Sequence, residues 1–347
     1  MTFQDEKNIS IIEGFLTENE IPFVKSIINI TLSDGSETDE VIFNINNNSI
    51  QLRYVNTLSH LMDYSKRFGI IGLPHNYFIN ISKENHKNNI RTIWIKDFEI
   101  NENSTIVDID GNVLENYHRK WEVLKGYVLT AVGKIKNRIY ARDCEVREVS
   151  NSELRPFLNT NCFYGYRSAN KNLGLYLKKD KNGLKKGTLV FVYTFGYNFY
   201  GNKNRQDNPF IEIIRVSTLI GTQVIGGASK LLKHFLLEYP VLKINNRDIE
   251  VKELKFYVDA DHNSGKSLET LGFTFESWDG YGFMNMWTCD YDDNQGLKGS
   301  ANEIFHRKPM FHKKIMELMK EHKIVSIANA GTIVYSLDKE NYLKQFS

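Results

Sequence analysis

A corner with almost no side chains, set between a β-rich run and an apolar helical pattern, most strongly constrains how this chain folds. The stretch QVIGGASKLLKHF, from Gln223 to Phe235, places two glycines and an alanine at the change of period. Glycine adopts the left-handed backbone of tight turns without strain, and its missing side chain lets other groups approach the main chain. The pattern predicts a tight turn followed by a helix over Ser229–Tyr239.

The same corner has the properties of an anion site. N–H groups at the start of a helix point away from it, and the helix dipole places partial positive charge there. The spacing Q-x-x-G-x-A fits a cradle for a diphosphate, and Ser229 is a candidate cap for the helix. The alternative is a tight strand-to-helix turn that binds nothing. The candidate cofactor-binding residues are Gln223, Val224, Ile225, Gly226, Gly227, Ala228, Ser229 and Lys230.

The length of the chain predicts two domains. It has 347 residues, and single hydrophobic cores rarely grow beyond about 250–300 residues. The pattern of strands and helices changes near residue 148. We therefore expect domains at 1–147 and 148–347, in the α/β (α+β) fold class.

Charge and cysteine content argue against several kinds of site. The 44 Lys and Arg residues nearly balance the 42 Asp and Glu residues, so a surface that binds nucleic acid has to be local. The three scattered cysteines form no C-x-x-C pair and the histidines no H-x-x-x-H, which argues against a disulfide framework and a metal site. No apolar run approaches the roughly 18 residues that span a bilayer, so we expect a cytoplasmic protein with no membrane partner.

Local patterns predict most of the secondary structure. The aromatic run at 191–201 suits either a buried central strand or a floor on which a base stacks, and burial is the favoured interpretation. Strands are predicted at 40–45, 49–55, 89–100, 137–149, 173–179, 188–198, 209–218, 253–260 and 331–337. Helices are predicted at 58–68, 117–134, 152–163, 229–239 and 309–322.

A family resemblance covers residues 138–335, carried by segments such as VIGGASKLLKHF, YVDADHNSGKSLETLGF and IANAGTIVYSL. These segments resemble the carboxy-terminal part of phage proteins related to homing endonucleases, which share a GNAT-like core with the Mom DNA-modification family. The resemblance implies a GNAT-like mixed-sheet domain that binds acyl-CoA at the glycine corner, beside a splayed strand pair. It also implies catalytic roles for Asp259, Arg215 and Ser264. Asp259 would orient or deprotonate an amine, and Arg215 would contact an anion.

Two further comparisons with these families concern residues that depart from the expected type. Cys162, in NCFYG, stands where the family has a histidine. The amino-terminal half, through SIQLRYVNTLSH, YFINIS and IRTIWIKDFEI, resembles the very-short-patch-repair type of restriction-endonuclease fold. There Arg53 stands at an expected carboxylate, Phe78 at an expected histidine and Ile81 at an expected lysine.

These departures predict a degenerate amino-terminal domain without nuclease activity. Metal-dependent cleavage of DNA needs clustered carboxylates around Mg²⁺, and a cationic side chain opposes that arrangement. Mg²⁺ is expected only if this half is active. The acidic residues that remain for it are Asp39, Asp97 and Glu99.

Clusters of basic residues near the domain junction and in the tail are candidate DNA contacts. Local groups of cations bind phosphate backbones. A run of charge also suits a solvated surface with no partner, and both interpretations stay open. The DNA-binding candidates are Arg119, Lys120, Lys134, Lys136, Arg138, Arg142, Arg307, Lys308 and Lys313.

The sequence leaves three functions open. The leading hypothesis is a phage-type, DNA-associated protein whose GNAT-like acyltransferase domain modifies a DNA base from an acyl-CoA donor, in the cytoplasm of an infected host cell. The first alternative is a homing-type DNA endonuclease. The second is a catalytically dead protein, repurposed to bind a protein partner or associated with the virion.

Overall fold

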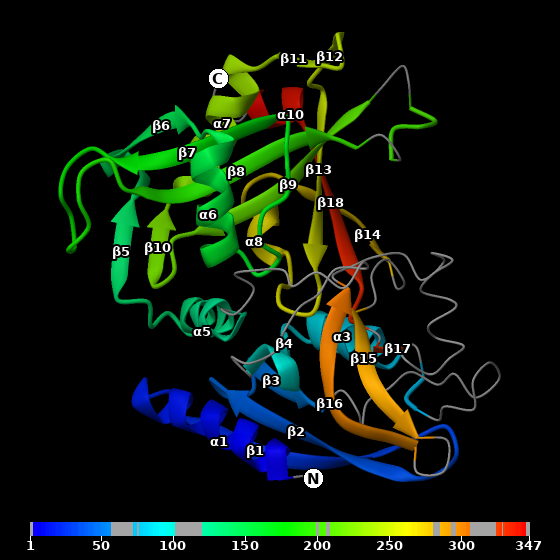
Figure 1. The fold of residues 1–347 in the computed structure, drawn as a ribbon. Coiled ribbons are helices and arrows are strands. Elements are labelled where there is room, and N and C mark those ends of the chain that lie inside the picture. Colours follow the sequence, from blue (N-terminus) through cyan, green and yellow to red (C-terminus); the bar gives the residue numbers. More distant parts are fainter. Residues whose placement is uncertain are drawn as a thin grey trace. The chain divides into compact units, whose positions relative to one another are not determined.

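The computed structural model describes most of the chain and divides it into two compact units. The described residues are 3–56, 72–74, 76–100, 120–198, 201–205, 209–279, 285–292, 296–305, 324–327 and 329–344. Unit 1 comprises Met1–Lys125, Asp259–Ser264 and Trp278–Thr332, and unit 2 comprises Gly126–Val258, Gly265–Ser277 and Ile333–Ser347. Helices and mixed sheets occur together (Figure 1), which confirms the predicted α/β (α+β) class. The division at residue 147 and the family of each domain stay predictions.

A four-stranded mixed sheet forms the base of unit 1. Its elements are α1 (Phe3–Glu18), β1 (Phe23–Thr31), β2 (Glu37–Ile45), β3 (Ile50–Val55), α3 (Tyr77–Lys87) and β4 (Arg91–Lys96). The strand order is β1-β2-β3-β4. The first three strands are antiparallel neighbours, and β4 runs parallel to β3. A parallel neighbour requires a crossover connection, and α3 lies within that connection.

The first helix covers one apolar face of this sheet. Phe43, Leu52 and Ile95 come from three different strands, and all are fully buried. On α1, Asn8 Nδ2 donates a hydrogen bond to Tyr54 Oη on β3 at 3.1 Å. The strands predicted at 40–45 and 49–55 are therefore confirmed as core strands of this unit.

Polar side chains line the opposite face of the sheet, which packs against α3. Arg53 on β3 forms an ion pair with Glu40 on β2, and Tyr77 Oη on α3 donates to Glu40 Oε2 at 2.5 Å. Trp94 Nε1 on β4 donates to Ser82 Oγ on α3 at 2.9 Å. These buried polar groups meet partners inside the protein, which is the condition for burying them without a large loss of stability.

The remaining elements of unit 1 follow β4 and recur late in the chain, and α5 (Lys120–Ala131) passes from unit 1 into unit 2 after Lys125. α4 (Asp97–Ile100) begins directly after β4, so the prediction of one strand over 89–100 is wrong beyond Lys96. α5 confirms the helix predicted at 117–134, and Phe15 on α1 packs edge-to-face against its Trp121 with ring centroids 5.5 Å apart. A second sheet has the order β16-β15-β17. Its strands are β15 (Asn285–Asp292), β16 (Gly296–Phe305) and β17 (Ile324–Ile327).

A seven-stranded sheet forms the frame of unit 2. Its strands are β6 (Cys144–Glu148), β7 (Lys171–Leu177), β8 (Leu189–Tyr197), β9 (Phe210–Thr218), β13 (Glu253–Asp259), β14 (Thr274–Asp279) and β18 (Thr332–Asp338). The strand order is β14-β18-β13-β9-β8-β7-β6. Neighbours from β6 to β9 are antiparallel, which confirms the pairing predicted for 173–179 with 188–198, whereas β13 runs parallel to β9.

Shorter elements complete unit 2. They are β5 (Asn137–Tyr140), the 3₁₀ turn η1 (Ala141–Asp143), α6 (Asn151–Asn161), β10 (Thr222–Ile225), α7 (Gly227–Glu238), β11 (Val241–Ile244), β12 (Arg247–Glu250), α8 (Lys266–Glu269) and α10 (Lys339–Lys344). The prediction of one strand over 137–149 is wrong at its centre, because η1 separates β5 from β6. β5 pairs in parallel with β10 instead.

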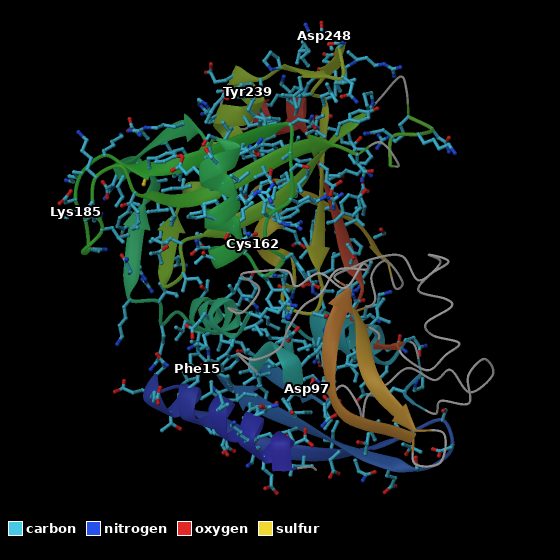
Figure 2. All side chains as sticks on the ribbon, viewed as in Figure 1. Phe15, Asp97, Cys162, Lys185, Tyr239 and Asp248 are labelled. Atoms are coloured by element: carbon cyan, nitrogen blue, oxygen red, sulfur yellow. The ribbon has the colours of Figure 1, made fainter. Side chains whose placement is uncertain are left out.

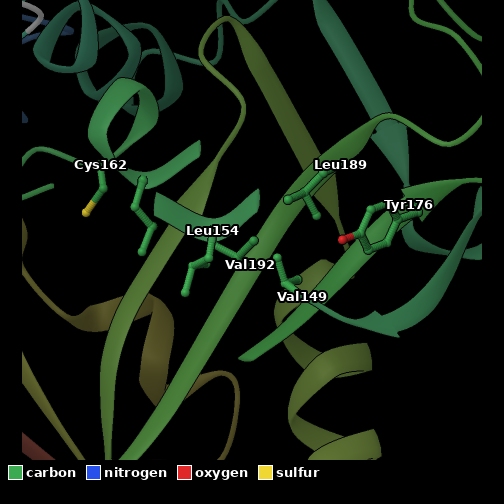
Figure 3. Close-up of a cluster of buried hydrophobic side chains, with 7 residues drawn as sticks. Val149, Leu154, Cys162, Tyr176, Leu189 and Val192 are labelled. Atoms are coloured by element: carbon green, nitrogen blue, oxygen red, sulfur yellow. The ribbon is translucent and has the colours of Figure 1, made fainter. Parts of the chain in front are cut away.

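Helices cover both faces of β8, so the aromatic run lies in the core. Val192 belongs to an apolar cluster with Leu154 and Cys162 at α6 (Figure 3). On the opposite face, the ring of Phe195 stacks on Phe235 of α7 with centroids 3.7 Å apart. The buried-strand interpretation of this run is therefore confirmed for the residues of β8.

Two of the predicted helices, at 58–68 and 309–322, lie outside the described residues. Among the helices that the structure does describe, none combines the length and apolar character needed to cross a membrane.

Replacing Gly174 on β7 with alanine should destabilise unit 2. An added Cβ would lie 2.5 Å from Leu189 Cδ1 and 2.7 Å from Val149 Cγ2, and such overpacking costs about 1–3 kcal/mol. Gly126 in α5 has no described atom outside its own helix within 4 Å of the same position, so Gly126→Ala should stabilise by about 0.5–1 kcal/mol. Urea unfolding of both variants measures the two signs, and a shift in the same direction would contradict the packing described.

Candidate functional site

The glycine corner lies between β10 and α7. Gly226 has a left-handed backbone with φ of 74° and is the N-cap of α7, and no described side chain caps this end of the helix. Gly226 is exposed, whereas Gly227 is buried against Val224, whose Cγ1 would lie 2.9 Å from an added Cβ. The start of α7 therefore places main-chain N–H groups at an exposed turn, which is the arrangement an anion site requires.

Two residues of the corner, Ser229 and Lys230, have contacts and positions that the sequence does not indicate. The helix begins at Gly227, so the prediction that Ser229 caps it is wrong, and the helix starts two residues earlier than predicted. Lys230 Nζ donates to Ala141 O at 2.9 Å and to Cys144 O at 2.6 Å. The ammonium group of Lys230 therefore holds η1 against α7. Burial lowers the pKa of Lys230, and the charge of Lys178 lowers it further.

The strands β9 and β13 are paired over only part of their length. Parallel pairing joins Phe210–Ile213 to Glu253–Phe256. β9 continues to Thr218 and β13 to Asp259, with no further pairing between them in this described part of the chain. The two strands therefore lose their mutual hydrogen bonds at their carboxyl ends, and the chain proceeds from that end of β9 into β10 and the corner.

Arg215, a predicted anion contact, is bonded to main-chain carbonyl groups. Its Nε donates to Gly165 O at 3.0 Å, and its Nη1 donates to Ile214 O at 2.9 Å. These bonds hold the loop after α6 against β9. Cys162 ends α6 and packs in the apolar cluster of that helix. Contact between Arg215 and an anion stays a prediction.

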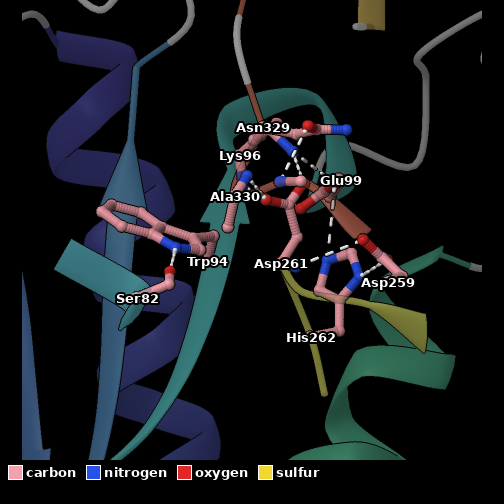
Figure 4. Close-up of polar contacts among 10 residues, drawn as sticks. Ser82, Trp94, Lys96, Glu99, Asp259, Asp261, His262, Asn329 and Ala330 are labelled. Carbon is pink, nitrogen blue, oxygen red and sulfur yellow. Dashed lines mark hydrogen bonds and ion pairs between the residues drawn. The ribbon is translucent and has the colours of Figure 1, made fainter. Parts of the chain in front are cut away.

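Charged side chains from distant parts of the sequence meet in a buried network within unit 1 (Figure 4). Lys96 ends β4, and its Nζ lies 2.6 Å from Asp261 Oδ2 and 3.9 Å from Glu99 Oε1. His262 Nδ1 lies 2.7 Å from Asp259 Oδ2, and His262 Nε2 lies 3.8 Å from Glu99 Oε1. Three carboxylates and two basic side chains therefore share one interior site.

Asp261 also fixes the main chain around this network. Its Oδ1 accepts a hydrogen bond from Ala330 N at 2.7 Å, and its carbonyl oxygen accepts one from Trp94 N at 2.8 Å. Glu99 Oε2 accepts a hydrogen bond from Lys96 N at 2.8 Å, so the helical turn of α4 places this acid back over the end of β4.

Burial and neighbouring charges have opposite effects on the two basic groups. Burial lowers the pKa of Lys96, but Asp261 and Glu99 outweigh it and leave the pKa above its ordinary value. Burial also lowers the pKa of His262, whereas Asp259 and Glu99 raise it to about 9. Both groups are therefore cationic at neutral pH and neutralise most of the carboxylate charge.

The predicted catalytic residue Asp259 is part of this network. Asp259 is buried and paired with His262, and Ser264 lies half-buried five positions further on. The catalytic roles of Asp259 and Ser264 stay predictions. Among the described His, Cys, Asp and Glu side chains, no group of three or more has the arrangement of a metal site.

Arg53 and Glu40 form a second buried charge pair in unit 1. Glu40 is fully buried and Arg53 nearly so, and the guanidinium carbon of Arg53 lies 5.1 Å from the ring centroid of Trp94. Phe78, at the position of an expected histidine, is part of the core, and Ile81 is half-buried on the same helix. Glu40 could not be identified from the sequence, because a single acid in an alternating strand has no distinguishing local pattern.

The predicted DNA-binding residues fall into three groups. Lys120 is buried with 6% of its surface exposed, so its predicted place on a basic surface is wrong. Four exposed residues belong to unit 2, namely Lys134, Lys136, Arg138 and Arg142. Four lie outside the described residues, namely Arg119, Arg307, Lys308 and Lys313.

Glu212 on β9 is a partly buried acid that no local sequence pattern indicates. Burial raises the pKa of its carboxyl group, against the lowering effect of Arg167 and of a hydrogen bond from Asn198. A carboxyl group with a raised pKa is a better proton acceptor near neutral pH. The shift depends on how the strand packs, and no local sequence pattern reports that.

Compared with known proteins, the chain matches no family model and no curated protein. The resemblances stated from the sequence therefore stay predictions.

Replacing Lys96 with methionine should strongly destabilise unit 1. Asp261 and Glu99 would remain buried without their cation, a change that costs about 3–5 kcal/mol. Lys185→Met is the control, because its ion pair with Asp180 lies in solvent and exposed pairs contribute only about 0–1 kcal/mol. Urea unfolding of both variants tests this, and similar small losses would contradict the role assigned to Lys96.

The ion pairs of His262 should make stability depend on pH. Its pKa is raised from 6.5 to about 9 on folding, so its contribution is complete below about pH 6.5 and is lost as the pH rises through 9. The free-energy difference between the wild type and His262→Gln should therefore shrink over this range, by on the order of 1–3 kcal/mol. Unfolding titrations at several pH values measure it, and a constant difference would contradict the charged state of His262.

Proposed function

We propose that this chain is a DNA-associated acyltransferase in which the corner between β10 and α7 binds the diphosphate of an acyl-CoA. The observation that carries the proposal is the exposed start of α7, which is capped by Gly226 and by no described side chain. N–H groups in this position, together with the helix dipole, favour an anion.

The topology of unit 2 supports the GNAT-like part of the proposal. β9 and β13 are parallel neighbours, and α7 lies between them in the chain. Ligands of open sheets bind outside the carboxyl ends of the strands, where strand pairing diverges. The pairing of β9 with β13 ends on that side, and the corner follows β9 there.

The proposed roles of individual residues come from the main chain of the corner and from the family resemblance. An acyl-CoA would supply the activated acyl group, and the main-chain N–H groups of Gly227–Ser229 would hold its diphosphate, because Lys230 N already donates to Gly226 O at 3.1 Å. A base must take the proton from the attacking amine, because only a neutral amine is nucleophilic. Asp259 is the base that the resemblance implies.

The proposal leaves the amino-terminal half without nuclease chemistry. A metal ion bound at Glu40 would have to displace both the guanidinium of Arg53 and the hydroxyl of Tyr77. Glu99, one of the acids left for the homing-endonuclease alternative, already lies in the buried network with Lys96, so that alternative requires buried charges to rearrange.

Calorimetric titration of the full chain with acetyl-CoA tests the proposal. We expect saturable binding, and we expect Ala228→Glu to weaken it at least tenfold because a carboxylate would stand at the start of α7. The same carboxylate complements the helix dipole and should leave folding stability unchanged or slightly higher.

The matched control is Ala228→Gln, which adds a similar volume without charge and should change the affinity by no more than about threefold, far less than a charge placed at a helix start. Absence of binding to the wild type would overturn the acyl-CoA assignment and favour the non-enzymatic alternative. Equal binding by the Glu and Gln variants would show that the diphosphate does not bind at the corner.

A further inference from the structure

Positive charge is concentrated in two short segments of unit 2. Residues 134–143 and 178–186 together carry nine Lys or Arg and two Asp, whereas the whole chain carries 44 basic and 42 acidic residues. The first segment contains β5 and η1, and the second is the loop between β7 and β8. A local excess of this size, in a chain of nearly balanced charge, marks a surface for a polyanion.

The fold brings these two segments into direct contact. Asn182 Nδ2 in the loop donates to Asn137 Oδ1 at 2.8 Å and to Arg138 O at 3.1 Å. Lys178 N donates to Asp143 O at 3.0 Å, and Lys178 Nζ donates to Arg142 O at 3.1 Å. The two runs therefore form one surface, named here the lysine surface. Its basic residues are Lys134, Lys136, Arg138, Arg142, Lys178, Lys179, Lys181, Lys185 and Lys186.

The acids of the lysine surface neutralise only part of its charge. Asp143 pairs with Lys181, and Asp180 pairs with Lys185. Figure 2 shows Lys185 on this loop. In the described part of the chain, Lys136, Lys179 and Lys186 form no ion pair, and all three are exposed. Their charges are therefore directed to solvent, where like-charge repulsion favours a bound anion.

An aromatic ring lies among these cations. Tyr140, at the end of β5, is 42% exposed. The guanidinium carbon of Arg142 lies 4.8 Å from its ring centroid, and Lys181 Nζ lies 5.4 Å from it. Contacts of this kind restrain the cationic side chains at the surface.

We propose that the lysine surface binds the phosphodiester backbone of DNA. The inference deepens the DNA-associated part of the proposed function and is independent of acyl transfer. The cations of the lysine surface are spread over two adjoining segments. The evenly spaced phosphates of a DNA backbone match this spread better than one compact anion does. Binding through phosphates requires no base contact, so affinity should depend strongly on salt and weakly on sequence.

The test uses the full chain and a fluorescent duplex of about 20 base pairs, titrated at salt concentrations from about 50 to 300 mM without acyl-CoA. The variant Lys136→Gln/Lys179→Gln/Lys186→Gln removes three exposed charges. Each lost phosphate contact should reduce the slope of log affinity against log salt by about 0.9, or between about 2 and 3 in total. At 0.1 M salt the affinity should fall on the order of 100-fold.

The matched control removes three exposed charges elsewhere in unit 2, through Lys203→Gln/Lys243→Gln/Arg247→Gln. It should keep the wild-type slope and affinity within about twofold, because phosphate contacts set both. Equal slopes for the two triple variants, or no duplex binding by the wild type at the lowest salt, would overturn the proposal. Loss of acetyl-CoA binding with unchanged DNA binding in the lysine-surface variant would also overturn it and assign these charges to the cofactor.

Discussion

The carboxylate of Asp261 is the group on which the cohesion of unit 1 most depends. This carboxylate joins the ammonium of Lys96 to the main-chain N–H of Ala330. The main-chain carbonyl of Asp261 also accepts a hydrogen bond from Trp94 N. A buried carboxylate is tolerated only when cations and donors compensate for the water that it loses. Lys96 and Asp261 are 165 positions apart, so this compensation is complete only after a long loop of chain has closed, which is a slow step in folding.

The same principle governs the second buried pair of unit 1. Glu40 is matched by Arg53 and Tyr77 on the face of the sheet that α3 covers. In both places a carboxylate has a cationic side chain of the protein as its neighbour. A site for a catalytic metal ion needs the opposite arrangement, with several carboxylates directed at one open position. The buried charges of this unit thus contribute to specifying its fold, since each pair is satisfied in one arrangement of strands and helices.

Local periodicity was sufficient to predict the strands β2, β3, β7, β8 and β9 and the helices α6 and α7. Local periodicity failed where a contact with a distant residue, or a hydrogen bond from a side chain back to the main chain, determines the local structure. Alternation continues through IKDFEI, yet the chain turns helical after Lys96 because the side chain of Glu99 bonds back to the main chain there. The strand over 137–149 is interrupted at η1, where Lys230 Nζ binds the carbonyl oxygens of Ala141 and Cys144. The buried network could not be predicted, because its charged side chains come from two distant segments, 96–99 and 259–262, with no shared pattern.

In unit 2, one strand pairing links the two proposed binding features. β10 pairs with β5 in parallel, with Gln223 opposite Arg138 and Ile225 opposite Tyr140. The corner that follows Ile225 therefore lies beside the lysine surface. Lys178 and Lys230 carry like charges there, and Lys178 disfavours the protonated form of Lys230. An anion held near them would relieve this repulsion, whether it is a diphosphate or a DNA phosphate. Acyl-CoA and DNA would therefore compete for the same positive potential unless they bound at distinct positions along it. Electrostatics alone gives no positive cooperativity between these two ligands.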